Sequence, residues 1–525
     1  MKSDCQGMTL FGTTTLIYSC LFIVLGVIVG GMSAAFPAKY GLAVIGCGVL
    51  VFKILKNWRW GLMTIAFSFV IVDLIRKVIA GFPKALLMVA DGLAVFIFAV
   101  FLIQYCLFKK EKILSYIPLN IQLLLLNLGC IAIIQSLNPS IPYLILGFSG
   151  LRTYLLYVPA ITFGLFFLRS ENDLRNLYHF LLFLSLPVIF LSIYQSSVDP
   201  GLLDVGMKSM DHRIHSFGTY FVDLIPGTFA SSKRYGRFLF LVYPYLFGLS
   251  VYFGLRKTCF VTFLIFGMGN IITGASEAVV IFILFHVYIW VFRKGTSLNK
   301  LIRISVIVLA GLIVWATALN WDKESITANN FRYKAILQDQ AQWKMRFNMY
   351  FKDSFKTYIE NFTISEMVFG MGTGTHGQEA RLLQDKERLA SNQVNRIGGD
   401  SGITKLLVEL GIFGFLAFVA MYALMLSSLR QCLLTLRRHR SYCVALSLFF
   451  IPVGWAILFV KAHTVISDGM VSFGLWFSVG FILAIKHYVV KGQFPGFCGG
   501  TEVHGSSRPL LDSNHVSATV HQFLK

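Results

Sequence analysis

The chain has 525 residues, of which 56% are hydrophobic and only 14% are charged. A soluble protein carries about a quarter charged residues, so the composition excludes a string of soluble domains, a disordered chain and a coiled coil. The net charge of +21 lies largely in short connections between apolar runs, where lysine and arginine set membrane orientation. We therefore predict an all-α polytopic membrane protein and expect no nucleic-acid partner.

Apolar stretches of roughly 20 residues, the length that crosses a bilayer as a helix, recur along almost the whole chain. Residues 1–135 hold five predicted transmembrane helices, 136–319 hold six, and 402–491 hold three. These about 14 transmembrane helices lie near 10–32, 39–56, 60–80, 84–108, 114–137, 141–168, 176–195, 236–255, 258–272, 277–292, 301–319, 402–427, 441–461 and 466–489. The polar tail at 492–525 is predicted to be flexible and cytoplasmic.

Basic residues occupy every second connection, which predicts cytoplasmic N- and C-termini by the positive-inside rule. The inner connections carry Lys53, Lys56, Arg59, Lys109, Lys110, Lys112, Arg169, Arg175, Arg256, Lys257, Arg293, Lys294, Lys300, Arg303, Arg430, Arg437, Arg438, Arg440, Lys486 and Lys491. One outer connection conflicts, because it holds Arg76, Lys77 and Lys84. Asp73 lies at helical spacing from the first two and is expected to neutralise part of their charge.

Two predicted outer segments, 196–235 and 320–401, are too long to be simple connectors, and segments of this length are usually functional or disordered. We expect one medium and one large periplasmic loop. Within the second, apolar residues recur every four positions over 343–359. This pattern predicts an amphipathic helix, either on the membrane surface or packed on the loop's own core.

Charged residues inside apolar stretches are candidates for function, because a charge in hydrocarbon costs several kcal/mol. Arg152 lies near the middle of the sixth stretch, where it could bind an anion, and Glu277 opens the tenth. Asp91 lies in the fourth, and a structural ion pair is its default role. Lys405 and Glu409 are four residues apart and are expected to neutralise each other.

Motifs for metal or cofactor binding are weak in this sequence. The run from Gly372 to Gly377 matches GxGxxG, but no strand-turn-helix context supports a dinucleotide fold. A tight turn is favoured there, while a turn whose amides approach a phosphate stays open. The chain has no HExxH, CxxC or GxSxG motif, so we expect no metal, no cofactor and no serine hydrolase. His376 is singled out because it lies in the large loop.

Several segments between residues 135 and 430 resemble the bacterial O-antigen polymerase and ligase superfamily. Arg346, a following helix and the run Gly370-Met371-Gly372-Thr373-Gly374 are similar to that family's arginine, helix and Gly-x-Gly-x-Gly element. The run from Asp400 to Gly414 resembles the family's entry into the span after its large loop. Gly227-Thr228-Phe229 before Pro244, and Gly150-Leu151-Arg152, also fit.

The departures from the family pattern favour a polymerase over a ligase. Ligases carry a histidine where this chain has Asp400, and the family's usual arginine after a Thr-Gly turn is Glu277 here. The arginine expected before Gly227 is absent, and Arg234 and Arg237 follow instead.

The resemblance implies an enzyme of the bacterial inner membrane that joins undecaprenyl-diphosphate-linked oligosaccharides at the periplasmic face without a metal. Arg152, Arg234, Arg237 and Arg346 are the expected diphosphate ligands, and Asp400, His376 and Glu277 are the expected catalytic bases. Membrane lipids, a chain-length regulator and a flippase are the other implied partners. Two alternatives stay open: an O-antigen ligase acting on lipid A core, and a transporter or flippase of lipid-linked oligosaccharide.

Overall fold

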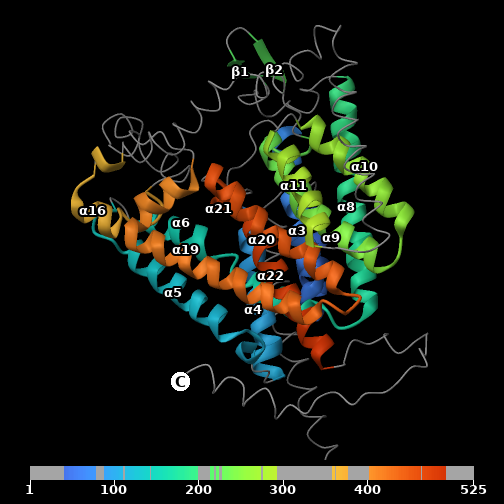
Figure 1. Cartoon of the computed structure of the whole chain (residues 1–525), viewed down its shortest axis with the longest axis horizontal. Coiled ribbons are helices and arrows are strands. Elements are labelled where there is room, and N and C mark those ends of the chain that lie inside the picture. The colour runs from blue at the N-terminus through green and yellow to red at the C-terminus, as the bar shows by residue number, and fades with distance from the viewer. Residues whose placement is uncertain are drawn as a thin grey trace, which may run out of the picture.

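A computed structural model describes residues 41–78, 88–109, 113–141, 144–198, 213–217, 220–223, 227–273, 276–292, 358–360, 362–375, 401–462 and 464–491. This part of the chain is mostly helical (Figure 1). The predicted helices at 10–32 and 301–319 lie outside the described residues, as does nearly all of the predicted amphipathic helix at 343–359.

The helices follow one another with short connections. In the first half they are α2 (Gly41–Lys56), α3 (Trp58–Val78), α4 (Val89–Leu102), the π-helix η3 (Ile103–Phe108), the 3₁₀ turn η4 (Ile113–Tyr116), α5 (Leu119–Ser136), α6 (Leu144–Leu155), α7 (Ala160–Phe167) and α8 (Glu171–Ser197). In the second half they are α9 (Ser232–Tyr252), α10 (Arg256–Ile272), α11 (Ser276–Phe292), α16 (Ile364–Phe369), α19 (Gly402–Leu436), α20 (Tyr442–Lys461), α21 (Thr464–Ser467) and α22 (Gly469–Val490).

Seven described helices are long and apolar enough to cross a membrane, counting α4 with η3 and α6 with α7 as one each. The other five are α5, α8, α19, α20 and α22. Helices lie at each predicted span that falls in the described residues. The chain therefore has the helical, apolar character of a membrane protein.

A short hairpin departs from the predicted all-α fold. Strands β1 (Arg213–Phe217) and β2 (Tyr220–Asp223) pair antiparallel within the segment 196–235, with Ile214 opposite Val222. Figure 1 shows the hairpin at one extremity of the molecule.

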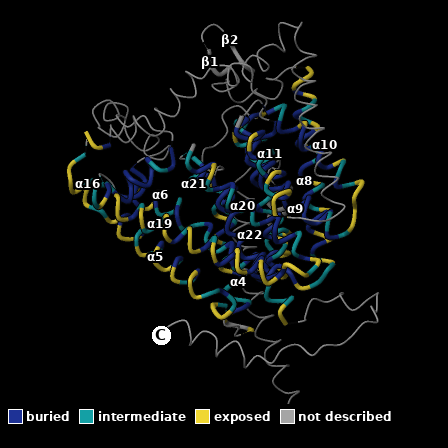
Figure 2. The backbone as a smooth tube through the Cα atoms, in the orientation of Figure 1, coloured by how far each residue is buried: buried dark blue, intermediate teal, exposed yellow. Residues whose placement is uncertain are grey.

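Helices α9 and α22 form the centre of the bundle, where nearly every side chain is buried (Figure 2). α22 packs against α7 and α20, and α20 packs against α9. The α7–α22 contact is very close, since a Cβ added to Gly480 would lie 1.9 Å from the Ile161 carbonyl oxygen, and one added to Gly164 would lie 2.1 Å from that of Phe477. Small residues allow this approach without a hydrophobic driving force in lipid.

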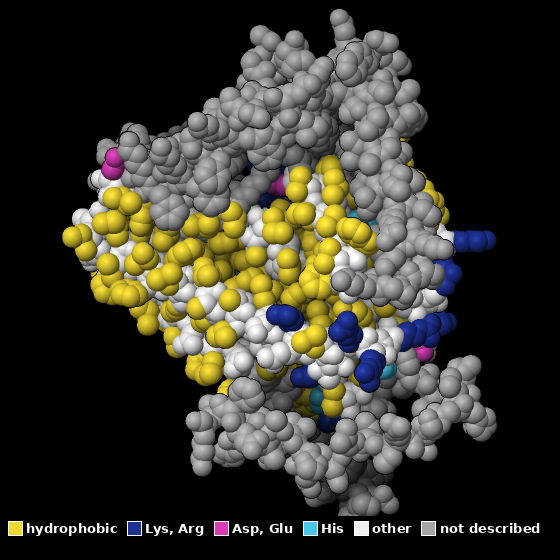
Figure 3. Space-filling view, viewed as in Figure 1, with side chains coloured by type: hydrophobic (Ala, Val, Ile, Leu, Met, Phe, Trp, Pro, Cys, Tyr) yellow, Lys and Arg dark blue, Asp and Glu magenta, His cyan; other side chains and the backbone are white. Residues whose placement is uncertain are grey.

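Charges separate from the apolar surface along the bundle. Figure 3 shows hydrophobic side chains across the middle of one face, with Lys and Arg gathered toward one edge. We call this the basic end, where α3, α8, α10 and α20 begin and α19 and α22 finish. Its cations are Lys53, Lys56, Arg59, Lys109, Arg169, Arg175, Arg256, Lys257, Arg437, Arg438, Arg440, Lys486 and Lys491.

The single helix predicted over 141–168 is interrupted. α6 ends at Leu155 and α7 begins after Pro159, with a turn between them. Proline cannot donate a backbone hydrogen bond, and its ring clashes with the preceding helical turn. The interruption places Tyr157 in the turn rather than on a helix face.

A second interruption lies inside α19 at Gly411, whose φ of 68° and ψ of −177° leave the helix. The break frees backbone carbonyls, and the Val408 and Glu409 oxygens accept from the amides of Met371 and Gly372 at 2.7 and 3.1 Å. The segment 370–375 is thereby fixed against α19 at the end of the bundle away from the basic end.

Candidate functional site: a six-charge cluster

Six charged side chains lie near the end of the bundle opposite the basic end. Three are arginines and three are aspartates, so their formal charges cancel. We call them the six-charge cluster: Asp73, Asp91, Arg152, Arg234, Arg237 and Asp468. They come from α3, α4, α6, α9 and the residue before α22, so the fold gathers them from distant parts of the sequence.

Arg234 is the centre of the first half of the cluster. Its Nη1 donates to both carboxylate oxygens of Asp73, at 2.8 and 2.6 Å. Its Nε lies 3.7 Å from Asp468 Oδ2. Asp73 was predicted to offset cations of its own helix, but its salt bridge goes to α9. The Arg234 side chain keeps 29% of its surface exposed, while Asp73 keeps 2%.

Arg237, one turn further along α9, is buried and holds Asp468 from the other side. Its Nη1 lies 3.4 Å from Asp468 Oδ2, and its Nη2 donates to Thr464 Oγ1 at 2.7 Å. Asp468 also caps α22 by accepting from the Met470 amide at 3.1 Å. Because its side chain is only 5% exposed, Arg237 serves to position Asp468 rather than to meet a ligand.

Arg152 and Asp91 form the second half of the cluster. Arg152 Nη2 lies 2.6 Å from Asp91 Oδ2, and the Tyr157 hydroxyl donates to Asp91 Oδ1. The expected structural pair for Asp91 is therefore present, and its partner is the arginine predicted to bind an anion. The Arg152 side chain is 34% exposed, so part of the guanidinium stays accessible while the pair is formed.

Tyr157 lies between the two halves. A Cβ added to Gly469 would lie 2.5 Å from the Tyr157 hydroxyl oxygen, so this hydroxyl touches the residue that follows Asp468. The tyrosine ring also packs near Phe69 of α3 and Phe473 of α22, with centroid distances of 6.2 and 6.4 Å. The turn before Pro159 thus joins Arg152 and Asp91 to the helices that carry Asp73 and Asp468.

A separate buried ion pair borders the cluster. Lys405 Nζ lies 3.5 Å from Glu409 Oε1, which confirms the predicted neutralisation within one helix. Tyr154 donates to Glu409 Oε2 at 2.6 Å, and Lys405 donates to Ser467 Oγ at 3.1 Å. Since Ser467 precedes Asp468, α21 connects this pair with the cluster.

The glycine-rich segment is a packed turn. Thr373 donates its amide to the Gln135 carbonyl at 3.1 Å and its hydroxyl to the Gly147 carbonyl at 3.0 Å. Together with the amides of Met371 and Gly372, these donors are used inside the protein. The phosphate-binding alternative is therefore wrong for these three amides, and the plain turn is confirmed.

The structure brings together three of the seven site residues predicted from sequence, namely Arg152, Arg234 and Arg237. Glu277 is buried at the start of α11, and no salt bridge joins it to the six-charge cluster within the described residues. Asp400, His376 and Arg346 lie outside the described residues. Ser401, which follows Asp400 in sequence, donates its hydroxyl to the Val460 carbonyl at 2.8 Å, next to α21.

Sequence reasoning missed the aspartates as site members. Asp468 carries a local signal, because an aspartate followed by an apolar helix is a good N-cap, but nothing in the sequence pairs it with residues more than 200 positions away. Asp73 carries the weaker signal of a carboxylate inside an apolar span.

Among the described residues, no group of three or more His, Cys, Asp or Glu side chains could hold a metal ion. The chemistry that the described cluster offers is that of guanidinium groups, carboxylates and one tyrosine hydroxyl. Known proteins supply no further assignment: the chain matches no protein-family model, and a search of curated proteins finds no significant relative.

Proposed function

We propose that this protein is an integral-membrane glycosyltransferase that joins saccharide units carried on a polyprenyl diphosphate, with the basic end of the bundle in the cytoplasm. The observation that carries the proposal is the six-charge cluster, in which two partly exposed arginines, Arg152 and Arg234, lie among buried carboxylates. The sequence resemblance to O-antigen polymerases supports it, and so does the concentration of cations at the opposite end.

The proposed reaction needs a charged leaving group and a base. A hydroxyl oxygen of the acceptor sugar attacks the anomeric carbon of the donor, and the bond from that carbon to the diphosphate oxygen breaks. The diphosphate leaves with the bonding electron pair, and the hydroxyl proton passes to a carboxylate or imidazole. Arginine holds phosphate oxygens in a bidentate manner, and fixed positive charge stabilises the departing diphosphate.

Arg152 and Arg234 are each already paired with an aspartate, which constrains how they would act. A diphosphate that binds one of them must compete with Asp91 or Asp73 for the same guanidinium. In exchange, it would leave a carboxylate with a freed lone pair beside the reacting sugar. Asp91 is the better placed of the two for this role, because its side chain is 13% exposed and that of Asp73 only 2%. Asp400 and His376 stay in the proposal as bases suggested by the resemblance.

The test is a transfer assay with purified protein and a lipid-diphosphate-linked repeat unit, with products separated on a gel. A ladder of products from the wild type, lost in Arg152→Lys and in Asp91→Asn, is the expected result. A ladder that persists in both variants would remove this cluster from the mechanism. Transfer only to an added lipid A core acceptor would identify a ligase, and translocation of the donor without any product would identify a transporter.

The assay has a matched control at the other end of the molecule. Arg59 Nη1 lies 2.7 Å from Asp173 Oδ1, in an ion pair with similarly shielded side chains. Arg59→Lys perturbs that pair in the same chemical way but at the basic end. It is expected to keep the product ladder, so a loss confined to Arg152→Lys reports on chemistry rather than on a weakened ion pair.

A further inference from the structure

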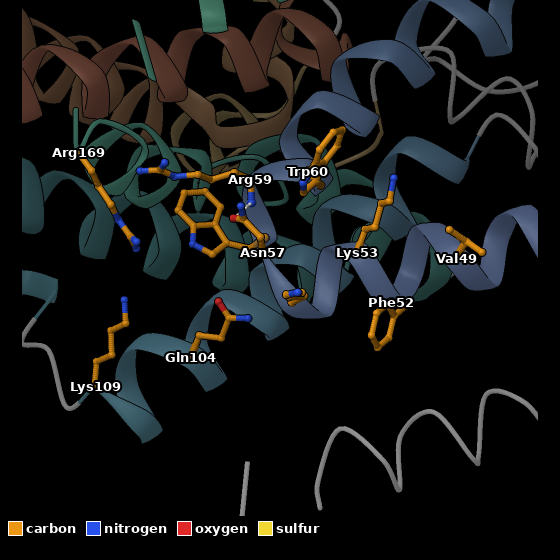
Figure 4. Close-up of a pocket in the computed structure, with 11 residues that line it drawn as sticks. Val49, Phe52, Lys53, Asn57, Arg59, Trp60, Gln104, Lys109 and Arg169 are labelled. Atoms are coloured by element: carbon orange, nitrogen blue, oxygen red, sulfur yellow. Dashed lines mark hydrogen bonds between the residues drawn. The ribbon is translucent and has the colours of Figure 1, made fainter. Parts of the chain in front are cut away.

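A cavity of about 830 Å³ opens at the basic end, where α2 meets α3 and approaches η3 (Figure 4). Five cations line it: Lys53, Lys56, Arg59, Lys109 and Arg169. No acidic side chain is among the lining residues, and the nearest paired carboxylate, Asp173, is engaged with Arg59. The cavity therefore has a strong local excess of positive charge and lies far from the six-charge cluster.

The helical connection explains why the cations converge. α2 ends at Lys56 and α3 begins at Trp58, so a single residue, Asn57, turns the chain. The side chain of Asn57 accepts from the Arg59 amide at 3.2 Å, which caps the new helix. The last turn of α2 and the first turn of α3 therefore present their side chains to one space.

Arg59 has donor capacity directed at this space. Its Nη1 is used by Asp173, whereas Nε and Nη2 are buried and have no hydrogen-bond partner within the described residues. Buried donors of a charged group without a partner are costly, and an anion in the cavity would satisfy them. Guanidinium donors with this geometry suit a phosphate group.

The rim of the cavity is apolar and faces outward. Val49, Phe52 and Trp60 are 53%, 50% and 48% exposed, and Lys53 Nζ lies 5.1 Å from the centre of the Trp60 ring. Such an exposed tryptophan beside a lysine is typical of the membrane–water interface. The site thus combines a basic pocket with an adjacent surface suited to acyl chains.

We propose that this cavity binds the phosphate of an anionic phospholipid, with its acyl chains along the Val49, Phe52 and Trp60 surface. Basic pockets between transmembrane helices bind anionic lipid head groups in this way. A soluble phosphate compound would satisfy the cations but would leave the apolar rim unused. The proposal does not depend on the transferase activity, because it concerns the opposite end of the bundle.

The experiment measures phosphatidylglycerol retention on the detergent-purified full chain by native mass spectrometry, with phosphatidylcholine as the neutral-lipid control. The test variant replaces three exposed lysines of the cavity, Lys53→Gln, Lys56→Gln and Lys109→Gln. The matched variant replaces three exposed cations elsewhere at the basic end, Lys257→Gln, Arg437→Gln and Arg438→Gln. Both lose the same charge, so only location differs.

The expected result is that phosphatidylglycerol is retained over phosphatidylcholine by the wild type and the matched variant, and that the cavity variant binds it roughly tenfold less. Equal loss in both triple variants would overturn the proposal in favour of diffuse attraction to a basic surface. Displacement of the lipid by an equal concentration of inorganic phosphate would overturn the lipid assignment and leave a soluble phosphate site. If the triple variant fails to fold, the single Lys53→Gln variant gives the same comparison against Lys257→Gln.

Discussion

Arg234 donates through one nitrogen to both carboxylate oxygens of Asp73, a residue 161 positions earlier in the chain, at 2.8 and 2.6 Å. The pair ties α9 to α3 at the end of the bundle that carries the candidate site. Asp73 additionally lies 3.4 Å from the amide nitrogen of Ala230, just before α9. The carboxylate therefore holds both the first turn of α9 and the segment that leads into it.

Removing one member of this pair is expected to destabilise the protein more than removing both. Asp73→Ala leaves Arg234 without its main partner in a low-dielectric setting, which costs about 3–5 kcal/mol. The double variant Asp73→Ala, Arg234→Ala removes the unpaired charge and is expected to recover part of the loss. Thermal unfolding in detergent measures both, and a double variant less stable than the sum of the two single variants would contradict the pairing.

Arg234 is expected to matter for turnover beyond its structural role. Arg234→Lys keeps the charge opposite Asp73 but loses the planar fork that grips phosphate. We expect the transfer rate to fall roughly 10²–10³-fold, the scale seen when one transition-state donor is removed, with a much smaller change in melting temperature. Arg59→Lys at the basic end is the control, and an equal loss of rate in that variant would argue against phosphate binding by Arg234.

Gly411 is expected to resist substitution by any residue with a side chain. A Cβ at this position would lie 2.3 Å from the Val368 carbonyl oxygen, and the φ of 68° is unfavourable for an L-residue. Gly411→Ala should release the 370–375 turn, seen as faster hydrogen exchange at the Met371 and Gly372 amides.

Gly254 provides the matched control for this substitution. It has a φ of 72° but no atom within 4 Å of an added Cβ, so Gly254→Ala carries only the backbone cost of roughly 1–2 kcal/mol. Unchanged exchange at Met371 and Gly372 in Gly411→Ala would show that the break in α19 does not hold the turn.

The α7–α22 contact is expected to be equally sensitive. Gly480→Ala would place a methyl group 1.9 Å from the Ile161 carbonyl oxygen, so the two helices must separate and the melting temperature should fall by several degrees. Gly129→Ala in α5 has open space around the added methyl and should stabilise the helix slightly. A Gly480→Ala protein as stable as Gly129→Ala would contradict the close approach.

The positions of the helices could be predicted from sequence because an apolar run of sufficient length has few alternatives in lipid. The Lys405–Glu409 pair could be predicted for a similar reason, since both residues lie on one helix at a fixed spacing. Asp73 with Arg234, and Arg237 with Asp468, could not, because their partners depend on which helices pack together. The break at Gly411 was also missed, as a glycine in an apolar run does not reveal whether its helix continues.

The interruption in α19 also fixes a length. From Gly402 to Gly411 the helix is anchored at one end by Ser401 on the Val460 carbonyl and at the other by the turn on Val408 and Glu409. Each residue of an α-helix advances about 100° around the axis. Inserting one alanine in this short stretch would therefore rotate Lys405 relative to Glu409's far anchor and break the helical phase that lets Ser467 and Tyr154 meet the same ion pair. The segment works as a calibrated spacer, whose residue number matters more than most of its residue identities.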